Sequence, residues 1–563
     1  TNIRDRTVIT NDSFSQTWEM NACGRYYSGK YARTFLKYDN LPALTSSDVV
    51  VGATMHMYKP NASSTITTVH AHKVLGTWAS ETITWDNKPN YDTTIEDYAV
   101  VDAIDWYGWD ITDVVRGWYA GENTGVMFKA SDEIETGSVA NFKEFYSSDY
   151  GSEPTRPVLS IIFRNNNGLE SYWDYTSSSA GRAGTGYINN YTGNLIWVRE
   201  DMRFDGNRMP VSINHVYNAN DAYVIRDSNN SNDSSGNGFG LGNGWRTNYN
   251  QLVYQWSTDS EYYVWEDSDG TDHYFKFSSN GEYKDEDGLE LTLTITGSGT
   301  ETYSITDKNG NISYFDSRGR LSRIQNNQAT PSSIIIAYDG NTNRISTITD
   351  GAGRKYLFEY VSDLLCSISY LGHGTEAIYS TVFEYEGNNL VFLFENEVAF
   401  AAYTYGANNL LTSAMSNLFY SLNYTYNTMT ANQPARIASV AEFHRDTAGG
   451  QLTFDYAHNQ TTVTDYYGNT VIYQFNNFGN TISVQDDEGH AQYYKFATDI
   501  SEDTENTARK NQLTASSKLQ NTVVNALKDS SFEAGNLWTC TWGDPTASIV
   551  TSEAYYGNKS MYI

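Results

Sequence analysis

The feature that most constrains the fold is a short unit that recurs between about residue 246 and residue 500. Each unit combines a turn rich in Gly or Asn, a strand of alternating polar and apolar residues, and an aromatic-X-Tyr pair. Clear examples are DKNGNISYFD at 307–316, FEYEGNNL at 383–390, YTYGANNL at 403–410 and GNTISV at 479–484. The spacing is irregular, about 20 residues per unit, and it indicates a repeat architecture.

Backbone geometry predicts antiparallel hairpins for these units. Gly and Asn adopt the positive φ angles that tight turns require. Alternation along a strand places the Tyr, Phe and Ile side chains on one face. A single hairpin cannot bury that face alone, so we expect neighbouring units to stack into a continuous β-spiral with the tyrosines in its core.

The order of Tyr-Asp at 338–339, Gly-Arg-Leu at 319–321 and related pairs resembles the YD repeats of RHS proteins. The resemblance implies a hollow β-spiral that encloses a toxin or an unfolded passenger, or, in other members, a part in adhesion. The chain departs from that pattern in two respects. It has few repeats for a closed shell, and it lacks the C-terminal core with self-cleaving aspartates.

The first 164 residues predict a β-sandwich with large aromatic residues in its core. Alternating or apolar runs at 49–58, 65–74 and 158–163 indicate strands, and short strands between turn signals are typical of a sandwich or barrel. The stretch 110–118 predicts a short helix with Thr112 as its N-cap.

Four ordered motifs in this segment resemble a DNRLRE domain, a β-sandwich module related to archaeal disaggregatase. The motifs are RTFLKYDNLP at 33–42, WASETITWDNKP at 78–89, WDITDVV at 109–115 and FYSSD at 145–149. The resemblance implies a jelly-roll sandwich, and relatives of this module are classed as carbohydrate-binding.

The expected fold class is therefore all-β, with a jelly-roll sandwich, a YD-repeat spiral and the start of a second sandwich. The last part rests on DSSFEAG at 529–535 and AYYGNKS at 554–560, which resemble the opening of a carbohydrate-binding jelly roll. The predicted parts are a DNRLRE-like sandwich (1–164), a connector (165–245), the repeat spiral (246–500), a linker or last irregular strand (501–523) and a truncated carbohydrate-binding-like module (524–563).

Charge and composition exclude several functions. With 37 Lys and Arg against 67 Asp and Glu, the net charge of −30 argues against nucleic acid and anionic membranes as partners. The three Cys, at 23, 366 and 540, lie far apart and predict neither a zinc site nor a disulfide framework. No stretch is long and apolar enough to predict a membrane span. The start at Thr1, without Met or a signal peptide, predicts a processed secreted protein or a fragment.

The sequence predicts two kinds of candidate site and no catalytic residue. The Asp-rich stretch with Asp267, Asp269 and Asp272 around a Gly is first a hairpin turn. Its alternative interpretation is a calcium site, because calcium prefers carboxylate oxygens. A glycan site needs exposed aromatic rings, and Trp106, Tyr107, Tyr26 and Tyr27 lie outside the tightest motifs. For each of these four, ordinary packing is the competing interpretation.

The predicted function is a non-catalytic, secreted or cell-wall-associated bacterial protein. Its sandwich modules would bind a polysaccharide or a cell-surface glycan, and its repeats would serve as the scaffold. One alternative is the N-terminal shell part of an RHS-type toxin-delivery protein, whose partner would be a C-terminal toxin or passenger. Another is a polysaccharide-degrading enzyme.

Overall fold

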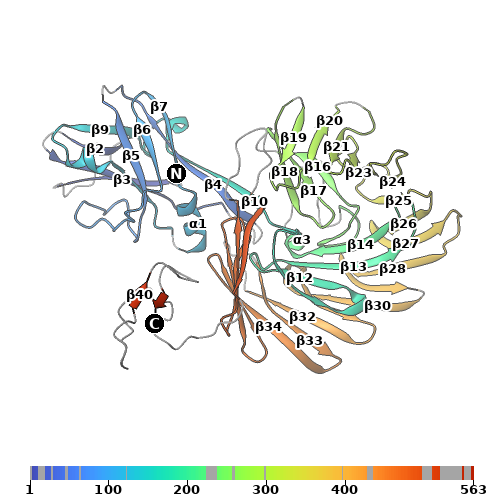
Figure 1. The fold of residues 1–563 in the computed structure, drawn as a ribbon. Coiled ribbons are helices and arrows are strands. Elements are labelled where there is room, and N and C mark those ends of the chain that lie inside the picture. The colour runs from blue at the N-terminus through green and yellow to red at the C-terminus, as the bar shows by residue number, and fades with distance from the viewer. Residues whose placement is uncertain are drawn as a thin grey trace, which may run out of the picture.

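The computed structural model describes most of the chain, and it is all-β as expected (Figure 1). The described residues are 3–10, 19–26, 29–42, 44, 48–62, 65–121, 123–223, 238–256, 260–279, 281–296, 299–395, 397–427, 435–497, 510–519, 548–550 and 560–562. No helix among these residues has the length and apolar character needed to cross a membrane.

The N-terminal module consists of two antiparallel sheets that face each other. The seven-stranded sheet has the order β6-β5-β8-β3-β2-β9, with β1 also paired to β3, and the three-stranded sheet has the order β10-β4-β7. Their strands are β1 (Ile3–Ile9), β2 (Met20–Arg25), β3 (Tyr31–Tyr38), β4 (Asp48–Lys59), β5 (Thr67–Lys73), β6 (Asp97–Val101), β7 (Asp105–Asp110), β8 (Val126–Ala130), β9 (Asn141–Tyr146) and β10 (Val158–Asn165).

Large buried side chains from both sheets form the core of this sandwich. Met55, Met57 and Trp109 from the smaller sheet pack against Phe128 and Phe145 from the larger one. The Trp109 ring meets that of Phe128 at a centroid distance of 5.0 Å. The sequence-based expectation of a sandwich built around large rings is therefore confirmed.

The strands expected at 49–58, 65–74 and 158–163 correspond to β4, β5 and β10. The expected helix is α1 (Thr112–Ala120), and the other helices are α2 (Asp132–Thr136), α3 (Ala219–Tyr223) and the 3₁₀ turns η2 (Glu153–Thr155), η3 (Gly181–Ala183) and η4 (Ala407–Asn409). The N-cap prediction is wrong by one residue, because Ile111 occupies that position. The Thr112 hydroxyl instead contacts Asp110 and the amide of Ala53.

The repeats form one antiparallel sheet of 24 strands, β16 to β39, each paired with the next along the chain. The first twelve are β16 (Leu252–Gln255), β17 (Tyr262–Glu266), β18 (Asp272–Phe277), β19 (Glu282–Asp285), β20 (Thr292–Ile295), β21 (Tyr303–Thr306), β22 (Ile312–Phe315), β23 (Leu321–Gln325), β24 (Ser333–Tyr338), β25 (Ile345–Thr349), β26 (Lys355–Val361) and β27 (Leu364–Gly372). The others are β28 (Tyr379–Glu386), β29 (Asn389–Glu395), β30 (Val398–Tyr405), β31 (Leu411–Ser416), β32 (Tyr420–Tyr426), β33 (Ile437–His444), β34 (Thr447–Ala457), β35 (Gln460–Asp465), β36 (Thr470–Phe475), β37 (Thr481–Asp486), β38 (Ala491–Phe496) and β39 (Leu513–Leu519).

A recurring hydrogen bond ties successive repeat units together. In several units the tyrosine hydroxyl donates to a backbone carbonyl of the preceding unit, over distances of 2.6–2.9 Å. The pairs are Tyr338 to Leu321, Tyr360 to Ile345, Tyr405 to Leu390, Tyr426 to Leu411 and Tyr456 to Ile437. The tyrosines are therefore core residues of the repeat sheet, as the sequence predicts.

The segment 165–245, expected as a connector, contains a sheet of its own. Its strands, in the order β11-β12-β13-β14-β15, are β11 (Tyr175–Ser179), β12 (Thr185–Asn189), β13 (Leu195–Arg203), β14 (Ser212–Asn218) and β15 (Trp245–Thr247). We call this the central sheet. The repeat strands are arranged in a curve around the central sheet (Figure 1). Its buried rings join one core with the repeats: Trp197 packs on Tyr403, and Trp245 Nε1 donates to the Tyr405 hydroxyl at 2.8 Å.

The far end of the repeat sheet returns to its beginning. Lys510, just before β39, pairs with Asp287 in the turn between β19 and β20, with 3.0 Å between Nζ and Oδ1. Asn511 Nδ2 donates to the Asp287 carbonyl at 3.2 Å. The stretch at 501–523, expected as a linker or a last irregular strand, thus supplies the last strand, β39. We call this junction the seam.

The C-terminal module expected at 524–563 falls almost entirely outside the described residues. Within it, only β40 (Ser548–Val550) and β41 (Ser560–Tyr562) are described, as an antiparallel pair.

The first prediction concerns a buried ion cluster between the central sheet and the repeats. Glu395 on β29 accepts from Arg182 and Arg199, and Arg199 also pairs with Asp201. Glu395→Ala leaves the Arg199 guanidinium buried without this partner, so we expect a loss of about 3–5 kcal/mol in the free energy of unfolding. Urea denaturation measures this change in the free energy of unfolding. The exposed Glu384 on β28 supplies the control Glu384→Ala, which should change stability by less than about 0.5 kcal/mol. Equal effects of the two substitutions would contradict the prediction.

Candidate functional site

Trp106 lies on the outer face of the three-stranded sheet of the sandwich. Inward residues of β7 alternate with outward ones, so Trp109 is fully buried while Trp106 is 38% exposed. Its cross-strand neighbour on β4 is Tyr58, and their ring centroids lie 5.4 Å apart. An exposed indole beside a second ring gives this face an apolar platform with hydrogen-bonding edges.

Two further tyrosines extend the platform. Tyr58 stacks on Tyr146 at a centroid distance of 5.8 Å, and Tyr146 stacks on Tyr150 at 3.4 Å. Contact with the Tyr150 hydroxyl raises the pKa of Tyr146 to about 12, so this ring stays neutral at physiological pH. We call Trp106, Tyr58, Tyr146 and Tyr150 the aromatic platform.

The other aromatic residues predicted for the glycan site are not in this platform. Tyr107 alternates to the inner side, packs edge-on against Phe145, and exchanges hydrogen bonds with Asp102. Tyr26 stacks on Phe142 at 4.1 Å, and burial raises its pKa. Tyr27 lies outside the described residues. Of the three predicted residues that the structure describes, only Trp106 combines substantial exposure with an exposed-face ring beside it.

Tyr58, Tyr146 and Tyr150 were not among the aromatic residues predicted from the sequence. Tyr58 lies at the end of a predicted strand, and alternation places it opposite the buried Met57. Alternation therefore predicts that Tyr58 faces outward, but it does not predict which strand lies beside β4. The pairing of β4 with β7, far apart in sequence, is what brings Tyr58 beside Trp106.

The Asp-rich stretch forms the hairpin turn between β17 and β18, and its three aspartates have different partners. Asp267 Oδ1 accepts from the amides of Asp269 and Thr271, both at 3.0 Å. Asp269 Oδ1 accepts from the Thr271 hydroxyl at 2.7 Å and from the Leu169 amide at 3.1 Å. Asp272 begins β18, paired with Glu266. Among the described residues, these three carboxylates do not form a cluster of ligand atoms. The calcium interpretation stays a prediction.

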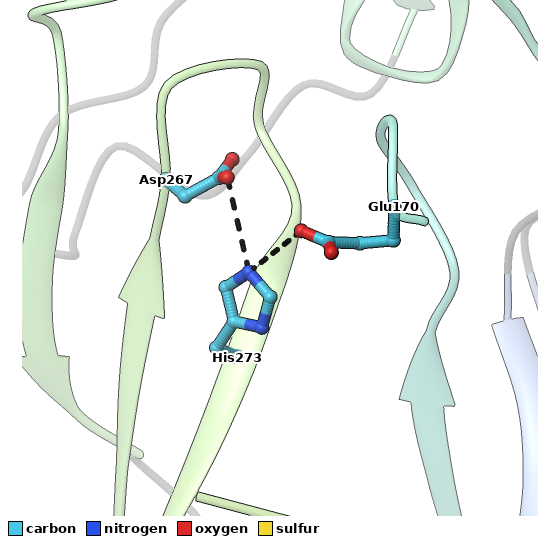
Figure 2. Close-up of side chains that lie close together, drawn as sticks. All are labelled: Glu170, Asp267 and His273. Atoms are coloured by element: carbon cyan, nitrogen blue, oxygen red, sulfur yellow. Dashed lines mark ion pairs between the residues drawn. The ribbon is translucent and has the colours of Figure 1, made fainter. Parts of the chain in front are cut away.

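Asp267 instead belongs to a cluster with His273 and Glu170 (Figure 2). His273 Nε2 lies 3.3 Å from Glu170 Oε1 and 3.8 Å from Asp267 Oδ2. On the other side of the ring, Nδ1 lies 2.8 Å from Asp287 Oδ2. Asp267 and His273 come from one hairpin, whereas Glu170 comes from the segment that follows the sandwich. We call Glu170, Asp267 and His273 the histidine cluster.

The electrostatics of the histidine cluster follow from burial and from its charges. Burial raises the pKa of Glu170. Burial opposes a charged imidazole, but the carboxylates around it raise the pKa of His273 well above its usual range. Burial also opposes the charged form of Asp287, yet Lys510 and His273 hold its pKa below the ordinary value. Without a bound cation, the charged His273 imidazolium is therefore held by the carboxylates around it, next to the seam.

One part of the chain is similar to a known family. Residues 15–162 match the model of carbohydrate-binding module family 96. The match covers the sandwich from β2 into β10, without β1, and includes every ring of the aromatic platform. The comparison with curated proteins gave no match.

Three solved structures show weak similarity. The crystal structure of TcdB2-TccC3-TEV has 10% identity and a TM-score of 0.23 over 84% of this chain and 27% of that one. The crystal structure of TcdB2-TccC3 has 9% identity and a TM-score of 0.22 over 87% and 33%. The Hadza microbial sialidase Hz136 has 8% identity and a TM-score of 0.13 over 78% and 93%. This chain thus spans a third or less of the first two, and scores this low support no argument.

The second prediction separates the surface tryptophan from the core one. Trp109 is fully buried and its Nε1 donates to the Val69 carbonyl at 2.9 Å, so Trp109→Ala should cost about 3–5 kcal/mol of stability. Trp106→Ala removes a ring that is part exposed, and we expect a cost of about 1 kcal/mol or less. Thermal melts of the two variants measure the contrast. If Trp106→Ala lowered the stability as much as Trp109→Ala does, Trp106 would be a core residue and the prediction would be wrong.

Proposed function

We propose that this chain is a non-catalytic, secreted or cell-wall-associated bacterial protein that binds a polysaccharide or cell-surface glycan through its N-terminal sandwich. The match of residues 15–162 to a carbohydrate-binding module family carries the proposal. That match supports carbohydrate binding and a place outside the cell or on its surface. Which glycan is bound, and by which residues, is our inference from the module's surface.

The aromatic platform is the proposed contact surface. Pyranose rings have apolar C–H faces that pack on aromatic rings, while their hydroxyls need polar partners. Trp106 offers the exposed ring, and its cross-strand neighbour Tyr58 widens the surface. Stacking of Tyr58 on Tyr146 holds these rings in place, so little side-chain entropy is lost on binding.

The repeat sheet is proposed as a scaffold. A ligand track along the repeats would need free tyrosine faces and hydroxyls. Here the hydroxyls of Tyr338, Tyr360 and Tyr405 are hydrogen-bonded to carbonyls of neighbouring units. The rings of the central sheet, such as Trp197, pack into the same core as the repeats. This packing supports a scaffold, because the apolar residues of the repeats are covered by residues of the same chain.

The third prediction tests the platform by glycan-array binding of the full chain. We expect specific binding by the wild type and at least a tenfold loss in Trp106→Ala, about 1.4 kcal/mol. The matched control is Tyr467→Ala, which removes an 86% exposed ring from the repeats and should leave binding unchanged. Repeating the array with a chelator in place of calcium tests whether binding needs the metal.

Two outcomes of this array would contradict the proposal. A folded wild type that binds no glycan would remove carbohydrate binding as the function. Binding that survives Trp106→Ala and is lost in Tyr467→Ala would move the contact surface from the sandwich to the repeats.

A further inference from the structure

Several turns in the repeats share one pattern of hydrogen bonds to an aspartate side chain. In these turns Asp Oδ1 accepts from the amides two and four residues later, and Oδ2 accepts from the side chain four residues later. The Asp and its later partner are Asp307 and Asn311, Asp316 and Arg320, Asp350 and Arg354, and Asp465 and Asn469. Both carboxylate oxygens are thereby used within the turn.

The turn at Asp267 departs from this pattern. Its Oδ1 accepts the same two backbone hydrogen bonds. The residue four positions later, Thr271, gives its hydroxyl to Asp269 instead. Asp267 Oδ2 therefore faces away from its own turn, toward His273 Nε2 (Figure 2). Glu170, from a distant part of the chain, brings a second carboxylate to the same nitrogen.

We infer that Glu170, Asp267 and His273 bind a divalent transition-metal ion. The three donor atoms lie within 4.8 Å of one another. Nε2 stands 3.3 Å and 3.8 Å from the two carboxylate oxygens. Tetrahedral coordination with bonds of about 2.1 Å places donor atoms about 3.4 Å apart, so these separations suit an ion between the three groups.

The surroundings of His273 match those of a metal-binding histidine. An imidazole that donates Nδ1–H to a carboxylate offers the lone pair of Nε2 to the metal. Asp287 Oδ2 is 2.8 Å from Nδ1, and Lys510 holds the other oxygen of Asp287. Binding of the ion replaces a proton at Nε2, and that proton passes to solvent.

The ligand set selects the class of metal. One imidazole and two carboxylates suit Zn²⁺, Co²⁺ or Mn²⁺, whereas Ca²⁺ takes six to eight oxygens.

Asp287, beside the site, also lines a cleft of about 840 Å³ at the seam, which gives solvent a route to this region. The bound ion links the segment after the sandwich, by Glu170, to the first repeats, by Asp267 and His273, next to the Asp287–Lys510 pair of the seam.

The test is Co²⁺ titration of the metal-free full chain, followed by visible absorption and by metal content after gel filtration. We expect one tightly bound equivalent for the wild type. Glu170→Gln and Asp267→Asn each keep side-chain volume and remove a charged ligand, so both should weaken Co²⁺ binding at least tenfold. Two such variants are used so that the result does not depend on either one folding. The control is His490→Gln, which changes an exposed histidine paired with Asp486 and should bind as the wild type does.

Competition assigns the metal class. Zn²⁺ should displace Co²⁺, and an equal concentration of Ca²⁺ should not. The inference is overturned if the wild type binds no stoichiometric Co²⁺, if Glu170→Gln and Asp267→Asn bind it as tightly as the wild type, or if Ca²⁺ displaces Co²⁺ as well as Zn²⁺ does. These results are independent of the glycan array, because the histidine cluster and the aromatic platform share no residue.

Discussion

The tyrosine hydroxyl that donates to a carbonyl of the preceding unit is the interaction on which the repeat sheet depends. Tyr405 reaches the Leu390 carbonyl, and Tyr426 reaches that of Leu411. The bond satisfies a polar group that the tyrosine brings into an apolar core. The units that carry this bond are each tied to the preceding unit, and the 24 strands of the sheet pair in sequence order without a crossover.

The central sheet packs against the long repeat sheet. A curved sheet with an unfilled apolar face would be unstable, and β11 to β15 supply the missing packing. Trp197 and Trp245 enter the core, while Arg199 and Glu395 place opposite charges at the same interface. Apolar residues of the central sheet and of the repeats thus form one continuous core. The same curvature returns β39 toward the first repeats and creates the seam.

The two candidate sites arise from different physical causes. The aromatic platform exists because strand alternation sends Trp106 outward and Trp109 inward within one short strand. The histidine cluster exists because, in one hairpin turn, the Thr271 hydroxyl donates to Asp269 and the second oxygen of Asp267 faces His273. The first site is open to a large ligand at the surface. The second is enclosed, with His273 only 1% exposed, and suits an ion.

Several features followed from the sequence alone. Local alternation and Gly or Asn turns determined the all-β class, the hairpin repeats, the tyrosine core and the strands and helix of the sandwich, because these depend on neighbouring residues. Trp106 was predicted as a candidate because it is an aromatic residue outside the tightest motifs of the sandwich. Tertiary structure decided the rest. The strands of the expected connector, the pairing of Tyr58 with Trp106, and the meeting of Glu170 with His273 all depend on contacts between distant segments. Local periodicity carries no information about such contacts, since packing of a whole sheet sets them.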